Sequence, residues 1–309
     1  MTAEWSSAGW RAAAVAWLDE GLAAAGLVRT GPVTQPRIRS WGTVLTAATS
    51  GGTVWMKATG AATAYEVAIY ELLTRVVPGR VLAPIALDAE RGWLLLPDGG
   101  PTGVGTALPA VLAQYAQLQR EVMPYVEHLV AAGVPDMRPA VMPARFDEAV
   151  AAVEELVARR GDEADRETMR AIRGRRDQFV DWCAQLVDAR VPPSIDHNDL
   201  HPGNVFVAGE PLTARFYDWG DSVVAHPFTS MLMATGGLAV DAYLEPFADL
   251  APRAQLVAEL ELACRVATVA RTLTWVRAVG VDGSDERFAM APLESLAAVA
   301  SPSWIDVSG

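Results

Sequence analysis

Two short clusters of acid and amide side chains lie close together in the second half of the chain. The first is the run HNDLHPGN at residues 197–204, and the second is DWGD at residues 218–221. In such clusters one Asp can accept the proton of an attacking hydroxyl, while an Asn and a second Asp supply the hard oxygen ligands that Mg2+ prefers. These are the side chains that a Mg-dependent transfer of a phosphoryl group requires.

A third candidate is Lys57, the only lysine in the chain. It ends the run TVWMK at residues 53–57, which has the hydrophobic pattern of a strand. An ammonium is a compact point charge that can reach between phosphate oxygens, and a guanidinium contacts them differently. Since arginine is used at every other Lys/Arg position, we predict a chemical role for Lys57 in holding phosphates.

At these positions the chain resembles the aminoglycoside phosphotransferase-like family of small-molecule kinases, which are distant relatives of protein kinases. The spacing His-x-Asp-x-x-x-x-Asn is similar to a kinase catalytic loop, and Asp-Trp-Gly is similar to a metal-binding triplet. No Gly-x-Gly-x-x-Gly loop precedes Lys57 and no Ala-Pro-Glu segment follows Asp218, which favours a small-molecule kinase over a protein kinase. The resemblance implies an α+β, bilobal protein-kinase-like fold, with a small antiparallel-sheet N-lobe and a mostly helical C-lobe.

The resemblance also implies a role for each side chain. Asp199 is expected to be the catalytic base, and Asn204 and Asp218 are expected to be ligands of Mg2+. ATP or GTP is the expected phosphate donor, with Lys57 on its phosphates, and the acceptor is a hydroxyl of a small molecule. Asp221 is expected either to assist the metal or to cap a following helix.

The other nucleotide contacts are expected in the first lobe. The family places the carboxylate partner of the strand lysine about one turn before a Leu-Leu pair, which favours Glu66, with Glu71 as the alternative. The phosphate loop is expected at Gly42, in a segment with a single glycine. Leu96 and Asp98 are expected to lie near the adenine.

Hydrophobic periodicity divides the chain into lobes at residues 1–97 and 98–309, with a hinge at the breaker cluster PDGGP, residues 97–101. In the first lobe we predict helices at 7–25 and 64–77, and strands at 33–38, 43–49, 53–58, 81–87 and 93–96. In the second lobe we predict helices at 107–132, 145–160, 163–189, 253–279 and 285–300, and a hairpin of 204–207 with 214–217. The uncharged stretch 222–240 contains Pro and Gly-Gly, which predicts a buried helix rather than a membrane span.

Composition restricts the class of protein. Of 309 residues, 51% are hydrophobic and 20% are charged, which is typical of a globular chain. The net charge of −12 disfavours nucleic acid and anionic membranes as partners. Cys183 and Cys264 have no metal-ligand spacing and are expected to be reduced, buried thiols. With no signal peptide in the charged N-terminal pattern, we expect a cytoplasmic protein that is a monomer or a weak homodimer.

The negative charge would suit a cationic acceptor such as an aminoglycoside, an amino sugar or an amino alcohol, or it keeps the protein soluble. Acidic candidates for the acceptor site are Asp241, Glu245, Glu259 and Glu261. The alternative function is a nucleotide-binding pseudokinase that acts as a sensor or scaffold, which the glycine-poor phosphate loop favours. The complete set of Lys57, base and metal ligands favours the enzyme.

The histidines are not assigned acid/base chemistry. His197 is expected to hold the loop backbone, and His201 to tune the loop or to serve its Pro-Gly turn. His226, before Pro227, is expected to begin a helix. The acid-rich setting of Arg159, Arg160 and the arginines of 170–176 predicts solvated helix faces rather than an RNA-binding patch.

Overall fold

The computed structural model describes residues 2–234, 239–280 and 287–301. Its contacts divide the chain into two compact units. They are Met1–Thr102 with Phe206–Gly220, and Gly103–Val205 with Asp221–Gly309.

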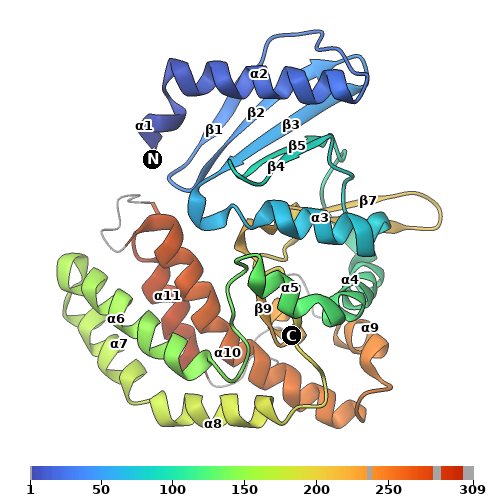
Figure 1. The fold of residues 1–309 in the computed structure, drawn as a ribbon. Helices are drawn as coiled ribbons and strands as arrows, with labels where there is room; N and C mark the ends of the chain where they lie inside the picture. Colours follow the sequence, from blue (N-terminus) through green and yellow to red (C-terminus); the bar gives the residue numbers. More distant parts are fainter. Residues whose placement is uncertain (1, 235–238, 281–286, 302–309) are drawn as a thin grey trace. The chain divides into compact units, whose positions relative to one another are not determined.

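The first unit contains an antiparallel sheet of five strands in the order β1-β2-β3-β5-β4. The strands are β1 (Thr34–Ile38), β2 (Gly42–Thr49), β3 (Gly52–Thr59), β4 (Ala86–Asp88) and β5 (Trp93–Pro97). Helix α2 (Ala8–Ala24) covers one face of this sheet (Figure 1), after a short helix α1 (Thr2–Trp5). The hydroxyl of Ser7 caps α2 by accepting a hydrogen bond from the Trp10 amide.

The two-residue period of β3 determines where Lys57 points. Val54, Met56 and Ala58 are buried and belong to the core that packs beneath α2. Lys57 alternates with them, so its side chain leaves the opposite face of the sheet. There it meets α3 (Glu66–Val76), whose first residue is the buried Glu66.

A hairpin from later in the sequence completes the first unit. It consists of β7 (Val205–Ala208) and β8 (Thr213–Phe216). Thr102 forms an isolated bridge with Phe206, and the Tyr65 hydroxyl donates to the Gly220 carbonyl oxygen at 2.8 Å. The division predicted at residue 97 assigns this hairpin to the second lobe, whereas its contacts place residues 206–220 in the first unit. Its partners there are distant in sequence.

The second unit is mostly helical. Its helices are α4 (Leu108–Val122), α5 (Val126–Ala131), α6 (Met142–Arg160), α7 (Glu163–Arg173), α8 (Arg176–Val187), α9 (Val240–Leu244), α10 (Arg253–Val279) and α11 (Ala291–Ala297). The short strands β6 (Ser194–Asp196) and β9 (Val223–Ala225) pair antiparallel. Along the chain, β6 precedes the cluster at 197–204 and β9 follows the cluster at 218–221. Helix α10 packs against α6, α8 and α11 (Figure 1), and buried Ala263, Cys264 and Ala267 allow close approach.

Three predicted helices differ from the structure. The helix at 107–132 is interrupted at Met123–Tyr125, where Pro124 has no amide hydrogen to donate. The helix at 163–189 divides into α7 and α8 at Gly174. The helix at 285–300 is α11 followed by a 3-10 turn at Ala298–Ala300, and residues 285 and 286 lie outside the described part.

The buried helix predicted over 222–240 is also wrong in part. The structure has the strand β9 and a buried 3-10 helix, Pro227–Leu232, before residues 235–238, which lie outside the described ranges. His226 does begin that helix, because its Nδ1 accepts a hydrogen bond from the Phe228 amide. Within the described residues, no helix is both long and apolar enough to cross a membrane.

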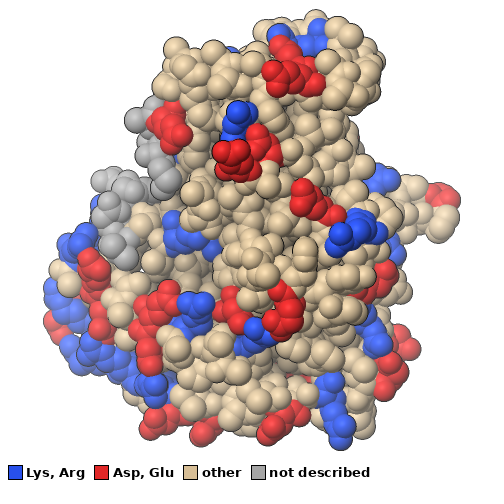
Figure 2. Space-filling view, viewed as in Figure 1, with Lys and Arg blue, Asp and Glu red and all other residues tan. Residues whose placement is uncertain are grey.

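Charges of both signs are interleaved over α6, α7 and α8, as Figure 2 shows. Arg159 pairs with Glu155, Arg170 with Glu163, and Arg176 with Asp147. These contacts confirm the prediction that the arginines of this region belong to solvated helix faces. Exposed pairs of this kind contribute little to stability.

Candidate active site

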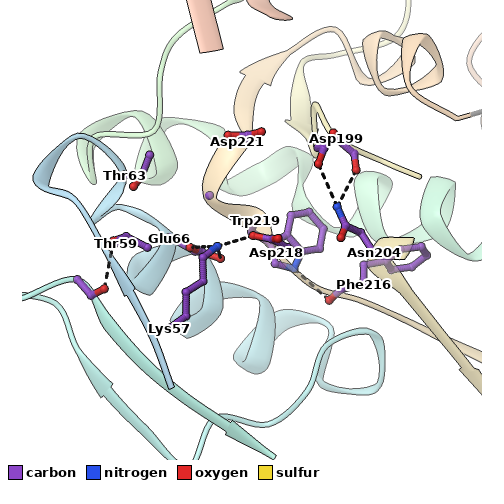
Figure 3. Close-up of polar contacts among 12 residues, drawn as sticks. Lys57, Thr59, Thr63, Glu66, Asp199, Asn204, Phe216, Asp218, Trp219 and Asp221 are labelled. Carbon is purple, nitrogen blue, oxygen red and sulfur yellow. Dashed lines mark hydrogen bonds and ion pairs between the residues drawn. The ribbon is translucent and has the colours of Figure 1, made fainter. Parts of the chain in front are cut away.

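In the first unit, Lys57 lies between two carboxylates (Figure 3). Its Nζ is 2.7 Å from Oε2 of Glu66 and 2.8 Å from Oε1, and it also contacts Oδ1 of Asp218. Glu66 is 1% exposed, whereas Glu71 lies on the exposed side of α3. The structure therefore gives Lys57 the partner that the sequence favoured.

The two carboxylates keep Lys57 charged. Burial acts to lower the pKa of Lys57, but the negative charges of Asp218 and Glu66 outweigh it, so the pKa is raised. The Lys57 side chain is 25% exposed while Glu66 holds its ammonium. A charged ammonium in this setting suits the binding of phosphate oxygens.

The Asp-Trp-Gly triplet has a backbone that suits its position beside Lys57. Asp218 has φ 65°, a left-handed conformation that Asp tolerates better than most residues. Trp219 is fully buried, and its Nε1 donates to the Phe216 carbonyl at 3.1 Å. A Cβ at Gly220 would lie 3.1 Å from Oε2 of Glu66 and 3.2 Å from Nζ of Lys57. A larger residue at this position would therefore require the ion pair to shift by a few tenths of an ångström.

In the second unit, Asn204 holds the side chain of Asp199 (Figure 3). The amide Nδ2 of Asn204 donates to the Asp199 carbonyl oxygen at 3.0 Å and to its Oδ2 at 3.2 Å. Because the nitrogen faces Asp199, the oxygen Oδ1 of Asn204 is left as the acceptor atom that a metal ion would need. The Asp and the Asn of the sequence cluster are thus one hydrogen-bonded pair.

A network of buried hydrogen bonds holds the start of the loop that contains Asp199. The His197 amide donates to the Tyr115 hydroxyl at 3.0 Å, and the Asn198 amide donates to Oδ1 of Asp196 at 2.7 Å. Ser230 Oγ contacts the Tyr115 hydroxyl at 2.8 Å and donates to Asp196 at 2.6 Å. Burial raises the pKa of Asp196, although these hydrogen bonds oppose the shift.

The two histidines of the loop have structural contacts. His197 is completely buried, and its backbone amide donates to the Tyr115 hydroxyl. His201 Nδ1 accepts a hydrogen bond from the Gly203 amide at 3.0 Å, so the proton of a neutral ring is on Nε2. That nitrogen lies 3.5 Å from Oδ2 of Asp199.

Sequence reasoning did not identify Arg271 of α10. Its Nη2 lies 3.0 Å from Oδ1 of Asp199, and its Nη1 lies 3.4 Å from Oδ2 of Asp221. Arginines recur along this helix, and the hydrophobic pattern does not say which one faces the loop. The available signal was the i,i+3 pair of Arg271 and Thr274, two hydrogen-bonding side chains on one face of a largely apolar segment.

Asp221 has two arginine partners. Besides Arg271, Arg277 lies 3.6 Å from its carboxylate. The expected role as the cap of a following helix is wrong, because β9 follows it after Ser222. Its carboxylate instead balances the positive charges on α10.

The remaining first-lobe candidates are occupied by strand and turn contacts. Gly42 is buried at the start of β2, where its carbonyl accepts from the Arg39 amide at 2.8 Å and a Cβ would meet the Ala58 oxygen at 3.0 Å. Leu96 is buried in β5. Asp98 is exposed and accepts from the Gly100 amide and the Trp55 indole, so its side chain stabilises the turn.

The acidic residues suggested for the acceptor do not gather around Asp199. Asp241 pairs with Arg253 and Glu261 with Arg265, while Glu259 faces the buried His226 at 3.7 Å, and burial lowers the pKa of that histidine. Glu259 precedes Arg271 by twelve residues of α10, which is about 18 Å along a helix axis. Glu245 is exposed at the end of α9.

The donor chemistry of the site fits magnesium and a nucleotide. Mg2+ is bound in proteins by one or two oxygen ligands together with substrate phosphates and water. Asn204 and Asp218 each offer an oxygen of this kind, and the Lys57 ammonium is a cation that suits phosphate. Their chemistry is therefore compatible with a magnesium nucleotide.

Comparison with known proteins identifies the fold. A family model described as the phosphotransferase enzyme family matches residues 55–261. Two solved structures resemble the whole chain: macrolide 2'-phosphotransferase type I (15% identity, TM-score 0.58, covering 94% of this chain and 97% of the other), and an ethanolamine kinase from Plasmodium vivax (13% identity, TM-score 0.61, covering 91% and 85%).

A spectinomycin phosphotransferase in complex with ADP and spectinomycin is also similar (13% identity, TM-score 0.56, covering 92% and 97%). At these identities the likeness concerns the fold, and the predicted protein-kinase-like α+β fold is confirmed. No curated protein matches the chain.

Proposed function

Because the chain belongs to the phosphotransferase enzyme family, a family of small-molecule kinases, we propose that it transfers the terminal phosphate of ATP or GTP to a hydroxyl of a small polar molecule. The observation that carries this proposal is the ion pair of Lys57 with Glu66 and its contact with Asp218. A strand lysine that is held by a helix carboxylate, beside an Asp-aromatic-Gly triplet, is the phosphate-binding arrangement of kinases.

The proposed chemistry gives each side chain one task. Glu66 orients the ammonium of Lys57, which binds phosphate oxygens and compensates their charge. Asn204 and Asp218 would hold Mg2+, which, when bound, neutralises the charge that develops on the phosphates. Asp199 accepts the proton of the acceptor hydroxyl, and its carboxylate is oriented for this by the Asn204 amide. Catalysis is then mainly positioning and charge compensation.

For the nucleotide base we propose the segment from Leu96 to Asp98 together with Phe206. A Cβ at Gly99 would lie 2.3 Å from the Phe206 ring, so this segment passes directly over an aromatic face. Phe206 in turn stacks on Tyr217 with ring centroids 4.4 Å apart. Because the Phe206 ring is buried, it would support the backbone of this segment, whose amide and carbonyl groups could bind the edge of the base.

For the acceptor we propose a polar alcohol, with the amino sugars and amino alcohols suggested by the sequence as members of a test panel. The panel is a macrolide, spectinomycin, an aminoglycoside, choline, ethanolamine and simple sugars, each with Mg-ATP and with Mg-GTP. Release of ADP or GDP that depends on the acceptor, with a phosphorylated product found by mass spectrometry, supports the proposal. The Asp199→Asn variant should bind nucleotide but keep only a small residual turnover.

The alternative is a protein that binds nucleotide without transferring phosphate. One observation favours it: Gly42 is explained by its close contact with Ala58, and no second glycine opens the predicted phosphate loop. Nucleotide binding with neither acceptor-dependent turnover nor ATP hydrolysis would select this alternative. Turnover that is lost in Asp199→Asn would reject it.

A further inference from the structure

The guanidinium of Arg271 makes two contacts with the loop that carries the proposed base and a third with Asp221. Nη2 is 3.0 Å from Oδ1 of Asp199, Nη1 donates to the Asn198 carbonyl at 2.9 Å, and Nη1 also lies 3.4 Å from Asp221. The side chain is only 12% exposed. One planar group therefore binds both the carboxylate and the backbone next to it.

The position of Arg271 is fixed by its neighbours on α10. Thr274, three residues after Arg271 on the same helix, accepts a hydrogen bond from Nδ2 of Asn198 at 2.9 Å. The guanidinium also lies over the ring of Trp275, 5.2 Å from the ring centroid. The Thr274 contact therefore holds the loop against α10. The Trp275 ring and the Asn198 carbonyl hold the guanidinium, so Arg271 meets Asp199 in one defined orientation.

Asp199 is thereby held from two sides. Oδ2 accepts from the Asn204 amide at 3.2 Å and lies 3.5 Å from Nε2 of His201, while Oδ1 faces Arg271. Oδ1 has a second lone pair, so an acceptor hydroxyl can still approach it. With only one of these partners, the carboxylate could rotate about its Cβ–Cγ bond and lose alignment with the reacting hydroxyl.

Asp221 can keep the charge of Arg271 compensated during the reaction. When Asp199 takes the proton of the acceptor hydroxyl, its negative charge is lost and its ion pair with Arg271 weakens. An arginine guanidinium is not deprotonated in proteins. Because Asp221 is a second carboxylate partner, the buried guanidinium remains compensated and does not have to move.

We propose that Arg271 is the positioning residue of the base Asp199, acting through that carboxylate rather than on the nucleotide; this assignment rests on the proposed function. The test compares Arg271→Gln and Arg271→Lys with the wild-type chain. Turnover is measured with the most active acceptor of the panel, or as ATP hydrolysis if water is the only acceptor that reacts.

Arg265→Gln is a closely matched control on the same helix. Arg265 is 15% exposed, pairs with Glu261, and lies 5.2 Å from the ring centroid of Trp182. It contacts the Ser301 carbonyl rather than the catalytic loop. A purely structural effect of losing a largely buried arginine should therefore appear in both Gln variants.

We expect Arg271→Gln to lower kcat roughly 10- to 100-fold, the scale of a small misplacement of a reacting group, with KM for the nucleotide unchanged. Arg271→Lys should restore part of kcat, and Arg265→Gln should leave kcat unchanged. In an Asp199→Asn background, Arg271→Gln should cause no further loss, because its target is already absent.

Two failures are distinguishable. If the wild-type chain transfers phosphate neither to an acceptor nor to water, the proposed function fails and the assignment of Arg271 falls with it. If the wild-type chain is active but Arg271→Gln loses no more kcat than Arg265→Gln, or adds its full loss to that of Asp199→Asn, only the assignment of Arg271 is overturned.

Discussion

The ammonium of Lys57 on β3 lies 2.7 Å from a carboxylate oxygen of Glu66 at the start of α3. We predict that Glu66→Ala lowers kcat/KM for the nucleotide roughly 10- to 100-fold, because Lys57 then has only Asp218 to orient it and is no longer held for phosphate. Steady-state kinetics with varied nucleotide measure the change.

Glu71→Ala is the control for this prediction. Glu71 is on the same helix, one to two turns later, and is exposed. Its replacement removes the same charge without touching Lys57, so kcat/KM should be unaltered. Equal losses in the two variants would show that the charge of α3 matters rather than the ion pair.

Gly220→Ala is expected to reduce activity without unfolding the protein. The added methyl group would sit 3.1 Å from the Glu66 carboxylate and 3.2 Å from the Lys57 ammonium, which is tight enough to displace the flexible end of the lysine. We expect a kcat/KM loss of about tenfold or more, equivalent to at least ~1.4 kcal/mol of transition-state stabilisation.

The comparison variant is Gly9→Ala, at an exposed position of α2 where a Cβ would meet nothing within 4 Å. It should keep full activity and gain up to about 1 kcal/mol of stability, since alanine is the better helix residue. If Gly220→Ala is as active as Gly9→Ala, the glycine of the triplet is not there to make room for the ion pair.

Contacts between residues at a fixed local spacing were readable from the sequence. The Asp199–Asn204 contact spans five residues, and the loop between them is short enough for the spacing to predict it. The strand pattern likewise placed Lys57 on a sheet face. Glu66 could be favoured over Glu71 only through the family resemblance.

Contacts between distant segments were not readable. Arg271 reaches Asp199 across seventy-two residues, and Tyr65 reaches Gly220 across 155. No local period encodes which turn of a long helix faces a loop. The breaks within the predicted helices at Pro124 and Gly174 were local, but a Pro or Gly inside an apolar pattern does not always end a helix.

Asp196→Asn should change the pH dependence of stability. Burial raises the pKa of Asp196 in the folded chain. Below the unfolded-state pKa of about 3.9 both states are protonated, and Asp196 contributes no pH dependence. Above it the unfolded chain releases the proton first, so stability falls by about 1.4 kcal/mol for each pH unit up to the folded-state pKa.

The variant should escape this loss, because the Asn oxygen can still accept from Asn198 and Ser230 and carries no charge to bury. Its stability relative to wild type should therefore rise with pH above about pH 4 and level off once the folded-state pKa of Asp196 is passed, as measured by urea unfolding at several pH values. Asp177→Asn, an exposed change on α8, controls for the loss of a carboxylate. A relative stability that falls with pH would contradict the assigned direction.

Tyr115→Phe tests the support beneath the catalytic loop. The Tyr115 hydroxyl accepts from the His197 amide at 3.0 Å and contacts Ser230 at 2.8 Å, fully buried. Its removal takes away this acceptor of a buried amide hydrogen, and losing such a hydrogen bond should cost about 1–3 kcal/mol of unfolding free energy.

Because the unsupported amide is two residues before Asp199, kcat should fall together with stability, whereas KM for the nucleotide should not change. Tyr125→Phe removes a hydroxyl from a side chain that is 36% exposed, and it should alter neither quantity. If Tyr115→Phe loses stability but keeps wild-type kcat, the network stabilises the fold without positioning the base, and the loop is held by its other contacts.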